Sequence, residues 1–219
     1  GVLQYIMAFP SVYEMTNPLT TVRKQHFWEY FTGDGLNGLI WQTLGSGSGG
    51  MDDQSSNGGY SLTATASGYN KKSLYFANIL QFSPTASVFI ANAKFNQTSG
   101  LTIGYVGLSA DGTDGATSRF YIGKMDSLQS TNFGAQTANS TGATLHIDGS
   151  VSQDTSYHSF KGVLGSSSCQ SYIDGVLDIT ASSPDKLPNT GLQPTVLSMA
   201  NAANPSIKVN IRYFEAYNT

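Results

Sequence analysis

Hydrophobic and polar side chains alternate along two segments of this chain in a way that is typical of β-strands. The segments are residues 89–95 (FIANAKF) and residues 207–213 (IKVNIRY). Because successive side chains of a strand point to opposite faces, a period of two predicts one buried and one solvated face. Shorter patterns of the same kind predict strands at residues 38–44, 60–66, 74–78, 101–108, 119–124, 143–147, 158–164 and 195–199.

A tight turn is predicted between two further strand-like runs. Residues 172–177 read YIDGVL. An Asp-Gly pair can adopt the positive φ angles that both central residues of a type I′ turn require. The sequence therefore predicts a two-residue β-hairpin centred on Asp174 and Gly175.

Glycine, proline and small polar residues separate the predicted strands. Residues 45–59 (GSGSGGMDDQSSNGG) are predicted to form a long polar loop, residues 109–116 a shorter loop, and residues 182–194 an irregular crossover between sheets. Helical periodicity is hard to find. About a dozen short strands with turns between them predict an all-β protein, either an antiparallel β-sandwich or a barrel.

Charge and hydropathy exclude two classes of partner. Lys and Arg number 11 and Asp and Glu 14, a net charge of −3. No basic surface is therefore expected for nucleic acid, whose binding depends on Lys and Arg contacts to phosphate. The sequence has no stretch of about 20 apolar residues, so membrane insertion is not expected either.

The first 25 residues differ in composition from the rest, because they are rich in Met, Tyr, Phe and Pro and contain no glycine after Gly1. We interpret residues 1–25 as an N-terminal arm and residues 26–219 as a single β-sandwich domain. The arm either packs along its own sandwich or docks on a neighbouring subunit, since an apolar segment left in water is costly. The second alternative predicts a homo-oligomer or a larger assembly.

The order of these features resembles a known family. An aromatic run at residues 26–31 is followed by FSPTASVFIANAKF (82–95), LTIGYVGLS (101–109), YIDGVL (172–177) and IKVNIRYFEAY (207–217). This order is similar to that of the concanavalin A-like lectin and glucanase group, which includes laminin-G-like domains. The resemblance implies an antiparallel jelly-roll sandwich whose first and last strands pair, with residues 27–31 beside residues 207–213.

Enzyme chemistry finds little support in the sequence. Glycoside hydrolysis uses two carboxyl groups held close together, which glucanases of this family carry on one strand as Glu-x-Asp-x-Glu. The glutamates here are Glu14, Glu29 and Glu215, each isolated in the sequence. Glu29 and Glu215 could meet if the terminal strands pair, but a structural position is the preferred interpretation. We therefore expect a protein that is not an enzyme.

The histidines and the cysteine offer no complete catalytic set. His26, His146 and His158 have no Ser and Asp partners at a recognisable spacing. His146 and Asp148 lie on one face of a predicted strand, an arrangement that suits a metal pair or an oriented base, although an exposed contact is the commoner meaning. The single cysteine, Cys169, is interpreted as a small buried hydrophobe.

Candidate ligand-binding residues come from aromatic side chains and from one polar loop. Trp41, Tyr69 and Tyr121 are possible platforms for a sugar ring, and Arg119, Asp111 and Asp114 could supply hydrogen bonds. Aromatic residues of an all-β chain are more often part of the core. Asp111 and Asp114 are also possible calcium ligands, although aspartate is common in loops because it stabilises turns.

Three functions remain open at this point. The first is a non-catalytic β-sandwich displayed on a surface, structural or glycan-binding, in a virion or an extracellular assembly. The virion is suggested by the last residues, RYFEAYNT, which resemble terminal strands of virion-associated proteins, and an extracellular or virion-surface location is expected with it. The alternatives are a soluble carbohydrate-binding lectin module and a polysaccharide-active enzyme.

Overall fold

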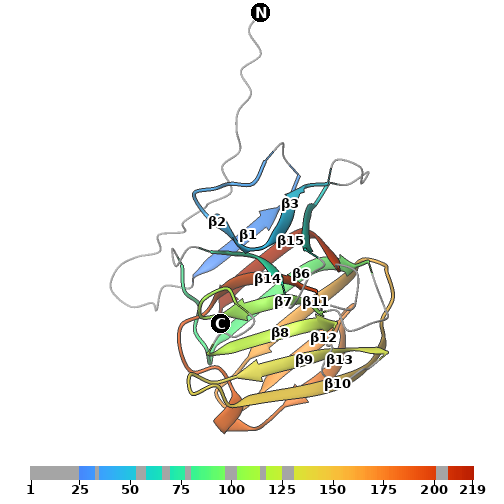
Figure 1. Cartoon of the computed structure of the whole chain (residues 1–219). Helices are drawn as coiled ribbons and strands as arrows, with labels where there is room; N and C mark the ends of the chain where they lie inside the picture. Colours follow the sequence, from blue (N-terminus) through green and yellow to red (C-terminus); the bar gives the residue numbers. More distant parts are fainter. Residues whose placement is uncertain are drawn as a thin grey trace, which may run out of the picture.

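The protein is an all-β sandwich of two antiparallel sheets (Figure 1). The structure, a computed structural model, describes residues 25–32, 35–52, 58–65, 70–76, 80–96, 103–113, 117–124, 131–200 and 207–219. In this part of the chain the one helical element is a 3₁₀ turn, η1 (Pro184–Lys186). The predicted fold class, a concanavalin A-like jelly-roll sandwich, is confirmed.

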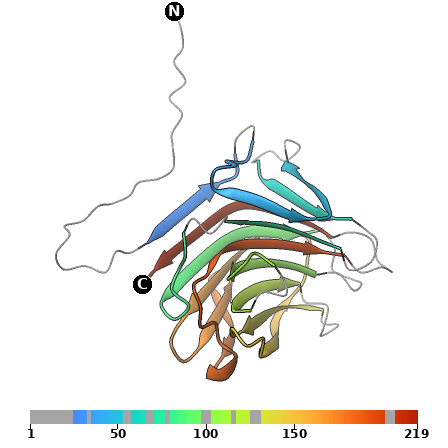
Figure 2. The same cartoon turned by 60° about the vertical axis from the view of Figure 1, so that its left-hand side comes forward.

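Sheet A has eight strands and sheet B has seven. Sheet A consists, in spatial order, of β13 (Val176–Ala181), β12 (Cys169–Ile173), β11 (His158–Leu164), β6 (Ser87–Phe95), β15 (Lys208–Asn218), β4 (Tyr60–Ala64) and β3 (Gly47–Met51), with β1 (His26–Tyr30) also paired to β15. Sheet B consists of β10 (Thr144–Ser152), β9 (Asn132–Ala138), β8 (Arg119–Lys124), β7 (Ile103–Ser109), β14 (Gln193–Met199), β5 (Lys71–Phe76) and β2 (Trp41–Gly45). Figure 2 shows that the sheets are curved.

The hydrophobic core lies between the two sheets and is rich in phenylalanine. Phe89 of β6 lies 5.7 Å, between ring centroids, from Phe120 of β8. Phe95 of β6 lies 6.0 Å from Phe133 of β9. In each pair one ring comes from sheet A and the other from sheet B. The alternation predicted for residues 89–95 is thus the alternation between this core and the outer face of sheet A.

The hairpin at Asp174 and Gly175 is confirmed. Ile173, the last residue of β12, lies opposite Val176, the first residue of β13. The two residues between them have positive φ angles, 50° at Asp174 and 83° at Gly175. This is the backbone that a type I′ turn requires, so the Asp-Gly pair was a reliable local signal.

The terminal strands pair as the family resemblance implied, but in a different register. The five residues of β1 lie opposite residues 217 to 213 of β15, with Tyr30 beside Tyr213. The first part of β15, residues 208–211, pairs with β4 instead. Because β15 is 11 residues long, its edge accommodates two shorter strands in succession.

Two strands were missed in the sequence. Gly47–Met51 was predicted to be part of a polar loop but forms β3, the last strand of sheet A, paired with β4. Glycine is required there at Gly47, because its φ is 144° and a Cβ atom would clash with the backbone carbonyl oxygen of Thr63. Asn132–Ala138 forms β9 between β8 and β10, and its sequence, NFGAQTA, lacks hydrophobic alternation.

Cys169 is fully buried in the core, as interpreted from the sequence. Burial raises the pKa of its thiol to about 12. The thiol therefore stays protonated at physiological pH and behaves as a small apolar side chain.

Several predictions fall outside the described residues or were not tested. Residues 1–24 lie outside the described part of the chain, so the arm, its boundary with the sandwich and its part in an oligomer stay predictions. The described residues include no helix that is long and apolar enough to span a membrane.

Candidate functional site

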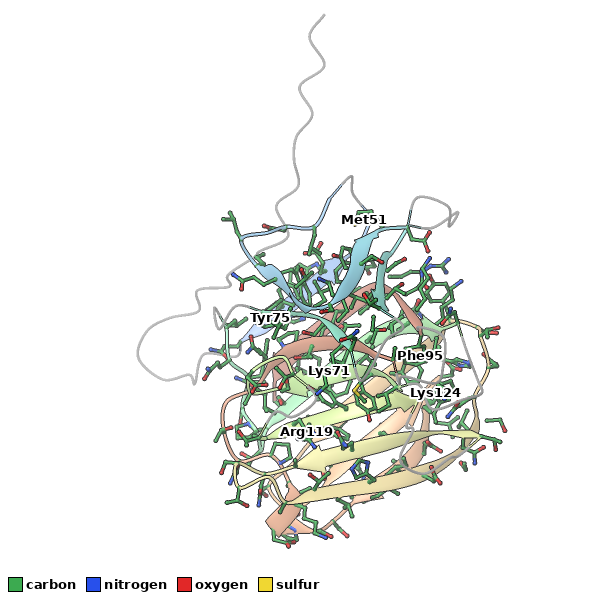
Figure 3. The ribbon with its side chains drawn as sticks, in the orientation of Figure 1. Met51, Lys71, Tyr75, Phe95, Arg119 and Lys124 are labelled. Carbon is green, nitrogen blue, oxygen red and sulfur yellow. The ribbon has the colours of Figure 1, made fainter. Side chains whose placement is uncertain are left out.

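The side of sheet B turned away from the core, called here the outer face of sheet B, carries one row of side chains across six strands. Strand registers place these residues side by side in the order Tyr75, Thr195, Gly107, Tyr121, Gln136 and His146. They come from β5, β14, β7, β8, β9 and β10; Figure 3 labels Tyr75 of β5 and Arg119 of β8. Strands that are far apart in the sequence thus contribute neighbouring groups to one surface.

Two tyrosines stack at the centre of the outer face of sheet B. The rings of Tyr105 and Tyr121 lie 5.2 Å apart and nearly parallel, at 13°. Glycine makes room for them, because a Cβ atom on Gly107 would lie 3.0 Å from the Tyr121 ring. Both tyrosines are buried.

The loop after β7 lies against this stack. The Tyr121 hydroxyl donates a 2.7 Å hydrogen bond to the Thr113 carbonyl oxygen. Gly112 packs against the ring of Tyr75, where a Cβ atom would lie 2.4 Å from Cγ. The Gly112 amide also donates to Ser109 Oγ at 2.9 Å. Residues 109–113 therefore close the tyrosine end of the outer face of sheet B.

A chain of hydrogen bonds runs from β8 to β10 on the same face. Arg119 Nε donates to Gln136 Oε1 at 2.7 Å. The Gln136 amide nitrogen, Nε2, then lies 2.9 Å from His146 Nε2. Since Gln136 Oε1 is the acceptor for Arg119, its NH₂ group must be the donor to His146. His146 therefore accepts this bond through an unprotonated nitrogen.

The electrostatics of the site favour that neutral imidazole. Burial lowers the pKa of His146, and the positive charge of Arg119 lowers it further. Both causes disfavour the imidazolium form. At neutral pH His146 is therefore a neutral, half-buried ring on β10, bonded to Gln136.

Carboxylates are scarce on this sheet. Within the strands of sheet B the one carboxylate is Asp148, which is exposed on β10 two residues after His146. The strand at the middle of this face, β8, presents Arg119, Tyr121 and Gly123 in the alternating outward positions. The structure thus confirms that His146 and Asp148 share a face and shows that the neighbouring groups are amide, guanidinium and phenol.

The other carboxylate pair considered in the sequence does not form a site. The terminal strands pair, but Trp28 lies opposite Glu215 and Glu29 opposite Phe214. Neighbouring positions of a strand point to opposite faces, so the two glutamates lie on opposite sides of sheet A. Burial raises the pKa of Glu29, and the nearby Trp41 indole offsets this only in part.

The predicted site residues lie in different environments. Trp41 was expected to be a possible sugar platform, but this was wrong, since it is 1% exposed and belongs to the core. Tyr69 and Asp114 lie outside the described residues. Arg119 and Tyr121 do lie on one face, as neighbours in the hydrogen-bonded and stacked groups above. Both are buried, so the expectation that Tyr121 is an accessible sugar platform was also wrong, and Arg119 is 7% exposed.

Asp111 has the turn-stabilising role that was the alternative to calcium binding. Its Oδ1 accepts hydrogen bonds from the Thr113 amide at 3.0 Å and from the Thr113 hydroxyl at 2.9 Å. Among the residues whose positions are described, no group of three or more His, Cys, Asp or Glu side chains could hold a metal ion. A calcium ion at Asp111 and Asp114 stays a prediction, because the second ligand is outside those residues.

Three residues of the outer face of sheet B were missed in the sequence: Tyr75, Tyr105 and Gln136. Tyr105 could have been found, because residues 103 to 109 alternate around it and it falls on the same face as Ile103. Gln136 belongs to β9, whose pattern carried no strand signal. Only the register of β9 between β8 and β10 reveals it.

A second cluster of titratable groups lies at the end of sheet A. His158 Nδ1 lies 2.6 Å from Asp174 Oδ2, and its Nε2 lies 2.9 Å from Asp154 Oδ1. Both ring nitrogens face carboxylates, so the imidazolium form is favoured. Burial lowers the pKa of His158, but the hydrogen bonds to the two aspartates outweigh burial and raise it overall.

This cluster predicts a pH dependence of stability. The contribution of His158 is fully present below its ordinary pKa of 6.5 and is lost as pH rises through the raised value. The pKa of Asp154 is lowered by the Ser156 amide and by His158, so its contribution is lost as pH falls from its ordinary 3.8 through the lowered value. Thermal melts of the unmodified protein and of His158→Gln should therefore differ most between about pH 4 and pH 6.5. A difference in melting temperature between the unmodified protein and His158→Gln that is the same at every pH would contradict this prediction.

Other proteins of known structure share this fold. No protein-family model matches the sequence, and no curated protein matches it. Solved structures do match: a glycoside hydrolase family 16 endo-glucanase from Bacteroides ovatus has 13% identity and a TM-score of 0.63, covering 86% of this chain and 98% of that one. A Bacillus licheniformis β-glucanase has 17% identity and a TM-score of 0.61, covering 89% and 98%. These chains share the fold.

The same fold also occurs in a Mycobacterium tuberculosis protein described as an immunostimulatory antigen and pseudo β-1,3-glucanase, with 14% identity, a TM-score of 0.61 and coverage of 88% and 98%. These neighbours contradict the expectation of a non-catalytic virion or surface protein, because they point to polysaccharide-active proteins. The prediction that the chain is not an enzyme is corrected for the same reason. At identities of 13% to 17%, the likeness shows a shared fold and no more.

Proposed function

We propose that this protein is polysaccharide-active and takes a glucan chain against the outer face of sheet B. The observation that carries the proposal is the match of the whole sandwich, over 86% of this chain and 98% of the other, to an endo-glucanase solved in complex with G4G3G-2F-DNP. A second Bacteroides ovatus structure with this fold holds a G4G4G3G product. Both names describe glucan oligosaccharides in sandwiches of this architecture.

The β10 edge of this face presents polar groups that can bond sugar hydroxyls. Arg119 and Gln136 are buried and are joined to His146 by hydrogen bonds, so the orientation of the His146 ring is set before a ligand arrives. On β10, His146 is half-buried and Asp148 is exposed. Few, well-placed polar groups of this kind determine orientation in ligand sites, and preorganisation reduces the entropic cost of binding.

Asp148 is the first residue to test for catalysis. Hydrolysis of a glycosidic bond uses one carboxyl group to protonate the leaving oxygen and a second as nucleophile or base. Asp148 is the carboxylate that the strands of sheet B supply. As a base, Asp148 would take a proton from the attacking water while the leaving oxygen takes a proton from solvent. The neutral His146, two positions away on the same strand, could accept the proton from Asp148 and return it to solvent.

The proposal is tested with neutral β-glucans, by measuring binding and the release of reducing ends. We expect His146→Ala to weaken binding about tenfold, the effect of losing roughly 1.4 kcal/mol, and Asp148→Asn to reduce cleavage more than binding. Asp185→Asn, at an exposed aspartate of η1, is the control and should change neither quantity.

Each result decides part of the proposal. No binding of any β-glucan would overturn it, and so would binding that His146→Ala leaves unchanged. Binding without release of reducing ends would remove the hydrolytic part and leave a carbohydrate-binding module.

A further inference from the structure

A pocket of about 430 Å³ lies where β1, β6 and β15 meet. Its lining residues are His26, Ile90, Glu215, Tyr217, Asn218 and Thr219. The volume falls in the range of small-molecule sites, about 300–1,000 Å³. This pocket belongs to sheet A, whereas the candidate site above belongs to sheet B.

Strand alternation places the pocket on the side of sheet A turned away from the core. Along β15, Phe214 and Ala216 are buried in the core, so Glu215 and Tyr217 point to the opposite side. Ile90 of β6 lies opposite Glu215 in the strand register and is only partly buried. The pocket is therefore on the outer face of sheet A, with the whole thickness of the sandwich between it and the outer face of sheet B.

The carboxylate in this pocket is held in one orientation. Glu215 Oε1 lies 2.8 Å from His26 Nε2, and Glu215 Oε2 accepts a 2.6 Å hydrogen bond from the Tyr213 hydroxyl. Burial, and then the bond to Glu215, raises the pKa of Tyr213, which keeps this hydroxyl protonated as the donor. A carboxylate oxygen has two lone pairs, so each oxygen keeps one acceptor position for a ligand.

Aromatic rings pack against His26, the partner of this carboxylate. The His26 ring lies 5.1 Å from the Trp28 ring and 5.6 Å from the Tyr217 ring, between centroids. Ile90 adds an apolar surface to the lining. The pocket thus combines flat apolar surfaces with a pair of fixed hydrogen-bond acceptors and the polar side chain of Asn218.

We propose that this pocket binds one neutral sugar unit of a glycan, at a second site separate from the outer face of sheet B. A sugar ring has apolar C–H faces, which suit Tyr217, and adjacent hydroxyls, which can donate to the two oxygens of Glu215. The lining contains no Lys or Arg, so the negative charge of Glu215 disfavours uronates and sulfated sugars. A polysaccharide chain long enough to reach both faces at once would bind with higher avidity.

The experiment uses calorimetric titration of the full chain with neutral β-glucan oligosaccharides, and with an alginate oligosaccharide as the anionic probe. Each pocket variant is also measured together with His146→Ala, which impairs the outer face of sheet B, so that the remaining binding reports the pocket. We expect Glu215→Gln and Tyr217→Ala each to weaken this remaining binding about tenfold, as an aromatic or charged contact of about 1.4 kcal/mol would. Alginate should not bind there.

Tyr172→Ala is the matched control, because Tyr172 is an aromatic residue of sheet A outside the pocket, beneath the Lys161 ammonium group at 5.3 Å. It should leave binding unchanged. Glu215→Gln retains the shape of the side chain, so it still tests the pocket if Tyr217→Ala fails to fold. Thermal melts show whether each variant is folded.

The outcomes separate the two sites. Remaining binding that neither pocket variant weakens would overturn this inference, as would complete loss of binding in His146→Ala alone, which would leave the sheet B proposal standing. Binding that is lost in Glu215→Gln but unchanged in His146→Ala would support the pocket and remove the sheet B proposal.

Discussion

Replacing Trp41 with alanine is expected to lower the free energy of unfolding by about 4 kcal/mol, within the range for large aromatic residues in cores. Trp41 is 1% exposed, and its ring lies 4.6 Å from Phe76 and 5.4 Å from Phe31 between centroids. Truncation would remove these contacts and leave a cavity, because neighbouring rings that are themselves packed can collapse only in part. Urea denaturation followed by circular dichroism measures the change.

The control for this prediction is an exposed aromatic residue. Tyr30 is the last residue of β1 and is 61% exposed. Tyr30→Ala should cost less than about 1 kcal/mol. If Trp41→Ala were no more destabilising than Tyr30→Ala, Trp41 would be an accessible side chain of the kind the sequence first suggested and not part of the core.

Replacing Gly162 with alanine is expected to destabilise the protein by about 2 kcal/mol, although it adds a single methyl group. A Cβ atom at Gly162 would lie 2.1 Å from Phe89 Cε1 and 2.8 Å from Phe120 Cε1. The Phe89 ring cannot easily move aside, because it is fully buried and also lies 6.1 Å from the Phe214 ring. The new methyl group must therefore displace rings or backbone.

A second strand glycine provides the comparison. Gly50 lies on β3, and nothing lies within 4 Å of the position that a Cβ atom would take there. Gly50→Ala should leave stability unchanged or raise it by up to about 1 kcal/mol, because alanine loses less conformational freedom on folding. Thermal melts of the two variants should move in opposite directions, or only the Gly162→Ala melt should move. Equal shifts would contradict the close packing of Phe89 over Gly162.

The chemistry of both proposed sites depends on residues that the sequence treats as unrelated. His26 and Glu215 are 189 positions apart and meet because the first and last strands pair. Arg119, Gln136 and His146 lie closer in sequence, but they join only because β8, β9 and β10 are adjacent in sheet B. Spacing rules describe neighbours on one strand or helix, so they cannot detect such sets.

Local signals in the sequence determined the fold class, several strands and one turn. The Asp-Gly pair at 174–175 predicted its hairpin, because both residues can adopt the positive φ angles of the turn. Residues 89–95 predicted a strand with one buried face, because their side chains alternate with a period of two. Tertiary structure alone decided that a glycine-rich segment forms β3, that β9 lies between two other strands, that Trp41 is buried and that Glu29 and Glu215 face opposite sides. Each of these depends on strand order and register, which arise from long-range pairing and packing and are not encoded by any single segment.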